Sequence, residues 1–298
     1  MVDEELSGLL AAGERAAFRG VPGQGLVPLE RAATRAADAG DDASRARAEW
    51  LLGVCRTATG RYGQALNGLR GIVSDAELAP QLRSLPASAA ATVQRQLGAH
   101  AEARRWDEVA LESAGGGVEA TCEAWLGLAS DGIGMGEADA ARVALAQAEG
   151  LATDETQWWR QRIRADWARA ELALLEGEPE YARAAAERAL EAAESASAPR
   201  HVAKSLLLAG VAATRQGRPD AAIDLLSRAA VLAEGLGALP LVWHSRALLG
   251  ALQQQSSPGD ATRSLDAART VVREVAGDLP APLEKLWLER PDVRALLA

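Results

Sequence analysis

Hydrophobic residues recur at intervals of three and four along nearly the whole chain, and short breaks with glycine or proline divide this pattern into paired segments. The clearest pair spans residues 203–233. In its break, Gly217 can end a first helix and Pro219 can begin a second one. We expect Gly210 to lie where the two helices come closest. The inward-facing residues of this pair are Leu206, Gly210 and Ala213 in the first segment and Ala222, Leu226 and Ala229 in the second.

The same unit recurs in a fixed register. Five glycines in breaks follow one another at separations of 38, 38, 41 and 40 residues, and an alanine stands five residues after each of them. The position nine residues after each glycine holds Leu69, Asp107, Leu145, Ala186 and Leu226 in turn. A register repeated five times predicts an array of helix pairs. The glycines are Gly60, Gly98, Gly136, Gly177 and Gly217.

The pattern predicts seven helix pairs and a last amphipathic segment. The expected pairs are 3–18 with 28–39, 44–58 with 62–74, 84–97 with 100–113, 118–134 with 138–150, 155–176 with 179–195, 201–216 with 219–235, and 240–254 with 258–275. Segment 283–297 should cover the apolar end of the last pair as a cap, because an end pair otherwise exposes its apolar face. We therefore interpret 1–298 as one solenoid, with a degenerate pair in 1–43, regular repeats in 44–276 and the cap in 277–298.

The repeats resemble a known family. Trp125, Leu128 and Ala129 follow the W-x-x-L-small order of a tetratricopeptide repeat (TPR), and the second segments carry its alanine–large–alanine row. The long period is similar to that of the TPR domains of bacterial signal-responsive regulators. This resemblance implies an all-α, right-handed α-solenoid of about seven helix pairs with a C-terminal capping helix. It also implies that first helices line a concave groove that binds a protein or peptide.

Composition narrows the possible partners. The net charge is −9 and the pI about 5.1, which argues against general binding of nucleic acid or anionic membranes. We expect Cys55 and Cys122 to be buried free thiols in a reducing cytoplasm, because two distant cysteines make neither a disulfide framework nor a zinc site. The start of the chain has no basic region followed by an apolar core, so we expect a cytoplasmic protein without a signal peptide or membrane span.

Catalytic patterns are absent from the sequence. His100, His201 and His244 fall in three different repeats, without metal-binding spacing, and we expect each at a solvent-facing or interface position. The glycines of 132–136 follow no strand, so a frayed helix end is favoured over a nucleotide-binding loop. The sequence predicts no catalytic residue, metal or cofactor. An enzyme with an unrecognised site stays an alternative.

The family resemblance assigns a set of Arg, Lys and Trp residues to the concave face. Arg binds carboxylates with two hydrogen bonds and Trp is a flat apolar anchor, so this row would attract an acidic peptide. In the alternative interpretation, Trp50 and Trp167 pack against neighbouring repeats and the arginines pair with Glu of the same surface. The expected partner-binding residues are Arg47, Trp50, Arg95, Arg160, Arg164, Trp167, Lys204, Arg215, Trp243 and Arg246.

The resulting functional hypothesis is a non-catalytic adaptor or regulatory scaffold that binds a protein or peptide in its groove. A sensor for a small anionic or peptide signal, controlling a separate effector, is the second hypothesis. Ends of helical arrays often pair with one another, so a homodimer is an arrangement that the sequence leaves open.

Overall fold

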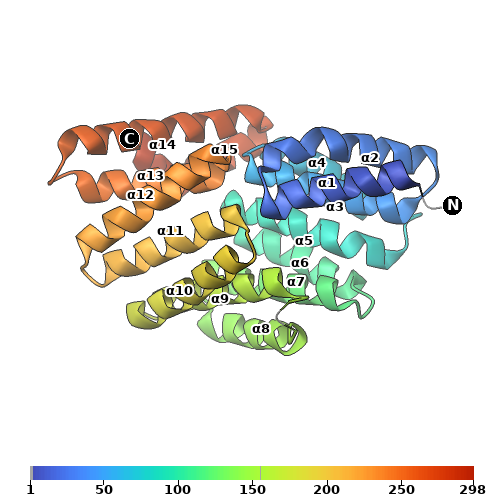
Figure 1. Ribbon diagram of the computed structural model, residues 1–298, viewed down its shortest axis with the longest axis horizontal. Coiled ribbons are helices and arrows are strands. Elements are labelled where there is room, and N and C mark those ends of the chain that lie inside the picture. Colours follow the sequence, from blue (N-terminus) through green and yellow to red (C-terminus); the bar gives the residue numbers. More distant parts are fainter. Residues whose placement is uncertain (1–2, 155) are drawn as a thin grey trace.

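The computed structural model describes residues 3–154 and 156–298, and over these residues the chain is an all-α repeat solenoid of seven helix pairs and two short C-terminal helices (Figure 1). The first helices of the pairs are α1 (Glu4–Arg19), α3 (Asp42–Ala58), α5 (Pro80–Gln96), α7 (Val118–Gly134), α9 (Trp159–Leu175), α11 (Pro199–Arg215) and α13 (Leu239–Gln253). The second helices are α2 (Leu26–Asp38), α4 (Tyr62–Ser74), α6 (His100–Ser113), α8 (Ala138–Leu151), α10 (Pro179–Ser195), α12 (Pro219–Gly235) and α14 (Pro258–Asp278). A 3₁₀ turn, η1 (Pro22–Gly25), precedes α2, and α15 (Ala281–Glu289) and α16 (Pro291–Leu297) end the chain.

The predicted turn glycines end the first helices of their pairs. After α3, the N–H of Gly60 donates to the carbonyl of Thr57, and the N–H of Arg61 donates to the carbonyl of Arg56 at 2.8 Å. This pattern requires a left-handed residue, which glycine adopts without steric cost. All five turn glycines have φ between 69° and 81°. The register read from the sequence is therefore confirmed at every break.

Small residues in the register let the helices of a pair approach closely. The five alanines that follow the turn glycines are completely buried, as expected: Ala65, Ala103, Ala141, Ala182 and Ala222. A Cβ atom added to Gly210 would lie 2.7 Å from Cγ of Leu226 in the second helix. Gly210 thus lies at the predicted contact between α11 and α12.

Two helix starts differ from the sequence prediction by four residues. The expected start of the fifth pair, residue 155, lies outside the described residues, and α9 begins only at Trp159. The reason is a turn, in which the Asp154 carboxylate accepts hydrogen bonds from the backbone N–H groups of Thr156 and Gln157. Helix α5 begins at Pro80 rather than at residue 84, because a proline is readily accommodated in a first turn.

The C-terminal segment reaches back to the beginning of the array. It packs on α14, but a break at Arg290 divides it into α15 and α16. The buried ring of Trp287 lies edge-on to Trp243 of α13, with ring centroids 5.7 Å apart, and to Tyr62 of α4 at 6.0 Å. The Arg290 guanidinium donates to the backbone carbonyl of Gln96 in α5. The last pair therefore meets the second pair, the C-terminal segment meets the third, and the solenoid closes into a ring (Figure 1).

Within the described ranges, no helix is both long enough and apolar enough to cross a membrane.

Candidate ligand cavity

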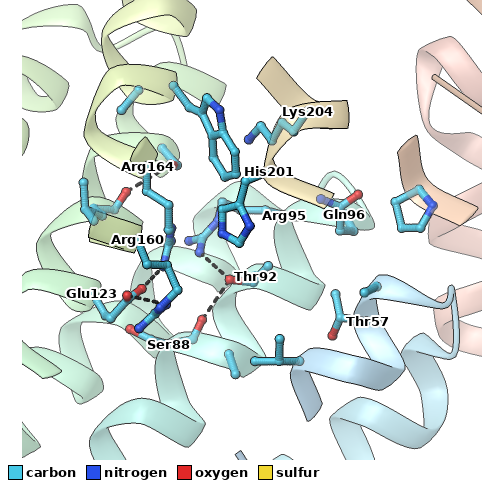
Figure 2. A pocket seen from close by; sticks show the side chains of 18 of the residues that line it. Thr57, Ser88, Thr92, Arg95, Gln96, Glu123, Arg160, Arg164, His201 and Lys204 are labelled. Atoms are coloured by element: carbon cyan, nitrogen blue, oxygen red, sulfur yellow. Dashed lines mark hydrogen bonds and ion pairs between the residues drawn. The ribbon is translucent and has the colours of Figure 1, made fainter. Parts of the chain in front are cut away.

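The ring encloses a cavity of about 410 Å³. Its lining comes mainly from the first helices of the pairs, α1, α3, α5, α7, α9, α11 and α13, with His100 of α6 as an addition. Figure 2 shows side chains from several of these helices pointing toward one another around this space. The volume is in the range of sites that bind small ligands.

Six of the ten residues expected to bind a partner line this cavity. Arg47, Arg215, Trp243 and Arg246 do not. Because the six come from four helices, the repeat register brings together positions far apart in the chain. They are Trp50 of α3, Arg95 of α5, Arg160, Arg164 and Trp167 of α9, and Lys204 of α11.

Trp243 is a core residue, and its assignment to the groove was wrong. Its side chain is only 2% exposed and packs against Trp287, because ring closure brings the C-terminal helices onto α13. Arg246, three residues further on, faces α12 instead of the cavity. Its guanidinium makes two hydrogen bonds to the Glu234 carboxylate, at 2.6 and 2.8 Å.

Arg47 and Arg215 also lie outside the lining. Arg47 packs behind Trp50, with its Cζ 4.8 Å from the Trp50 ring centroid, and forms an ion pair with Glu14 at 3.0 Å. Arg47 therefore supports a cavity wall without reaching the cavity. Arg215 is the last residue of α11 and is exposed to solvent.

Two lining arginines share one buried carboxylate. Glu123 of α7 is 3% exposed and forms ion pairs with Arg160, at 2.6 Å, and with Arg164 (Figure 2). Arg160 also pairs with Glu119 at 3.0 Å. These contacts match the alternative in which arginines pair with Glu of the same surface. Burial lowers the pKa of Arg164 to about 10, which leaves its guanidinium protonated at neutral pH.

Arg95 joins three helices through a buried charge network. Its Nη1 lies 2.5 Å from Oδ2 of Asp107 in α6 and 3.1 Å from Oδ1 of Asp131 in α7. Ser88 of α5 donates to Asp107 at 2.9 Å. Burial raises the pKa of Asp107 to about 7, and that of Asp131 is raised too, because two desolvated carboxylates share one guanidinium. A Cβ atom on Gly127 would lie 2.2 Å from Asp107, so glycine makes room for this network.

The sequence does contain a signal for this network. Asp107 stands in the register position that holds Leu69, Leu145, Ala186 and Leu226 in the other repeats. A carboxylate in a row of core residues requires a buried partner. The register thus pointed to a polar cluster, although it could not identify Arg95 and Asp131 as its members.

The two lining tryptophans are mostly buried, with exposures of 4% for Trp50 and 7% for Trp167. Trp50 packs against Phe18 at 5.8 Å between ring centroids. The Trp167 indole N–H donates to the Ser205 hydroxyl at 2.8 Å. Both residues therefore pack between repeats, as the alternative interpretation held, and both border the cavity as well.

Two further lining residues were not expected there. His201 was expected at a solvent-facing or interface position, and it lies at the interface with the preceding pair. Its side chain is 2% exposed and stacks on Trp167 at 5.2 Å between ring centroids. Its neighbour Arg200 donates to the backbone carbonyl of Ala17 at 3.3 Å. Within the described residues, no carboxylate forms an ion pair with Arg200. The spacing of Arg200 and Lys204, four residues apart on one helix, was the available sequence signal.

Comparison with known proteins identifies the fold. No family model and no curated protein matches the chain. Among solved structures, a Rap protein complexed with competence and sporulation factor is similar, with 14% identity, a TM-score of 0.68, and coverage of 98% of this chain and 85% of that one. The chain has a TPR-like solenoid fold.

Two other structures support this TPR-like fold. Cut9, in the APC/C hetero-tetramer Cut9–Hcn1, has 14% identity and a TM-score of 0.62 over 95% of this chain and 48% of that one. Aspartyl phosphate phosphatase F from Bacillus subtilis has 13% identity and a TM-score of 0.53, with coverage of 100% and 83%. At such low identity, the likeness concerns the TPR-like fold alone.

Proposed function

We propose that this protein is a non-catalytic regulatory scaffold that binds a short peptide with an acidic group in its central cavity. The observation that carries the proposal is the cavity itself, in which Arg95, Arg164 and Lys204 from three different pairs lie beside apolar and aromatic walls. Arg and Lys suit carboxylates, and Trp faces suit apolar side chains. The Rap protein complexed with competence and sporulation factor supports the proposal as a precedent for a ligand-bound form of this fold.

The size of the cavity favours a peptide segment or a small molecule over a folded partner. An anionic ligand can bind by exchanging ion pairs: Glu123 now neutralises Arg160 and Arg164 together, and Glu171 neutralises Lys204 at 3.1 Å. A ligand carboxylate would offer these cations a second acceptor. An acidic protein would thereby bind an acidic peptide at a local cationic surface.

A small anionic signal is the second candidate ligand, and the position of the cavity among residues of all seven helix pairs favours it. The same fold would then act as a sensor that controls a separate effector. The two candidate ligands can be told apart by binding measurements. If the ligand is a peptide, its affinity should change with the apolar residues next to the acidic group, whereas a small anionic signal has no such residues.

The test is a binding screen with labelled short peptides in which acidic, neutral and basic sequences share the same apolar residues. We expect acidic peptides to bind, and Lys204→Glu to weaken binding, because it places a carboxylate beside Glu171. Arg228→Glu, on the exposed face of α12, is the matched control and should bind like the parent. The proposal fails if no peptide binds, or if Lys204→Glu binds acidic peptides with parental affinity.

A further inference from the structure

Two cationic side chains lie where α11 meets the cavity. Arg200 and His201 are the second and third residues of this helix, and Lys204 follows one turn later; all three line the cavity. The first turn of a helix lies at the positive end of the helix dipole. Figure 2 shows His201 and Lys204 from this helix beside Arg95 and Arg164.

His201 is fixed in place without a polar partner. Its ring stacks on Trp167, with an interplanar angle of 21°, and meets Trp159 edge-on at 5.3 Å. Its Nδ1 is buried and has no hydrogen-bond partner among the described residues. A buried polar atom without a partner costs free energy, so this ring gains stability when it acquires a hydrogen bond.

The charges around His201 do not balance at α11. Glu171 pairs with Lys204, and Glu123 pairs with Arg160 and Arg164. Arg200, in contrast, forms no ion pair with a carboxylate within the described part of the chain. Burial, followed by the charges of the nearby cations, lowers the pKa of His201 well below its ordinary value. The charged groups on the elements around it are Arg19 of α1, Glu123 of α7, Arg160, Arg164 and Glu171 of α9, and Arg200 and Lys204 of α11.

We propose that Arg200, His201 and Lys204 form an oxyanion subsite at the start of α11, which holds a carboxylate or phosphate group of the ligand. The inference rests on the proposed function, because it assigns the acidic group of that ligand to one wall of the same cavity. Arg200 supplies the uncompensated charge and Lys204 a second cation. His201 supplies a directed N–H donor, and the positive end of the α11 dipole adds to the favourable potential.

The subsite couples binding to a proton. A bound anion offsets the cations that lower the pKa of His201, which are Arg160, Arg164, Arg200 and Lys204, and raises this pKa from the lowered value of the empty protein. Between the two pKa values binding takes up a proton, so affinity increases as pH falls through this range. Below the lower value and above the higher value, the protonation of His201 no longer makes affinity depend on pH.

Sulfate is a suitable first probe, because its charge stays constant over the pH range of the experiment. Imidazole NMR spectra contain signals from only three histidines, His100, His201 and His244, and the His201 signal is assigned by its loss in His201→Gln. We expect sulfate to shift the His201 signal selectively, with an affinity that increases toward lower pH. Trifluoroacetate, a carboxylate that also keeps its charge, separates a carboxylate preference from a phosphate-like one.

Three variants test the assignment. Arg200→Gln and Lys204→Gln should each weaken sulfate binding by about 10- to 100-fold, the usual effect of losing a charged hydrogen bond. Arg228→Gln is the control and should bind sulfate like the parent. His201→Gln should keep part of the affinity and lose its pH dependence.

Equal shifts of all three histidines, or parental sulfate binding in Arg200→Gln, would overturn the subsite. If Arg200→Gln binds an acidic peptide with parental affinity, the subsite is also wrong while the proposed function stands. If sulfate binds at His201 and no peptide binds, the subsite stands and the peptide function fails.

Discussion

The side-chain carboxylate of Asp278, in the last turn of α14, accepts a hydrogen bond of 2.6 Å from the backbone N–H of Gly63, in the first turn of α4. The same carboxylate accepts a second bond of 2.8 Å from Gln64. The residue before α4, Arg61, provides no side-chain cap. Asp278 thus caps a helix that lies 215 positions earlier in the chain.

Asp278→Ala should destabilise the protein by about 1–2 kcal/mol, the usual cost of losing a helix cap and a charged hydrogen bond. Urea unfolding measures this cost, and small-angle scattering should show a larger radius of gyration if the ring opens. Asp266→Ala is the control, because Asp266 also lies on α14 but pairs only with Arg269 near it. Equal unfolding midpoints of the two variants would mean that this cap contributes nothing.

Arg290 holds the C-terminal helices in place. Its guanidinium lies between the rings of Trp243 and Trp287, at 5.2 and 5.5 Å from their centroids, and makes two bonds to Asp292. We expect Arg290→Lys to cost about 2–3 kcal/mol, because an ammonium group cannot stack or bind in this fork-like way.

Unfolding by urea measures the effect, and tryptophan fluorescence reports on the two rings. Arg263→Lys, at an exposed site of α14, should leave stability near the parental value. If Arg290→Lys unfolds at the parental midpoint, the stacked guanidinium is dispensable.

The network around Asp107 makes stability depend on pH. Because burial raises its pKa to about 7, above the value of about 3.9 expected in the unfolded chain, the folded state binds more protons in this window. Stability should therefore fall as pH rises from about 4 to about 7, by at most about 1.4 kcal/mol per pH unit for each proton. Asp107→Asn should flatten this slope. Urea unfolding of both proteins at several pH values in this window measures the slope of stability against pH. An unchanged slope in Asp107→Asn would mean that other groups cause it.

Gly210→Ala should destabilise the protein by about 1–3 kcal/mol, because the added methyl group overlaps with Leu226. Gly71→Ala, at an exposed site in α4 with no neighbour within 4 Å, should instead stabilise by about 0.5–1 kcal/mol through helix propensity. Thermal or urea unfolding of the two variants should show changes in stability of opposite sign. Shifts of the same sign would show that helix packing at Gly210 is looser than described.

The repeat pattern predicted most of the fold because its determinants are local. Gly177 and Pro179, or Gly217 and Pro219, mark where one helix ends and the next begins, and the alanine row marks the buried face. The same register brought Arg164 and Lys204 to one cavity, since equivalent positions of stacked pairs lie side by side. Local signals of this kind need no knowledge of the final curvature of the array.

Ring closure could not be predicted, because it depends on the rotation accumulated over all the pairs. Trp243 occupies a motif position that would face a groove in an open solenoid, yet the returning C-terminal helices bury it. The burial of His201 has a different origin, since its main contact, Trp167, belongs to the preceding pair. Sequence spacing gives the face of a residue on its helix, but not what a distant part of the chain places against that face.

Ring closure also limits how the array can change its length. An open solenoid can gain or lose a unit, because each pair contacts only its neighbours. Here an additional pair would move Asp278 away from Gly63 and Arg290 away from Gln96, and both junctions would be lost together. Deletion of a pair would have the same effect. The contacts between the two ends of the ring therefore fix the number of helix pairs, because only an array of the present length can form them.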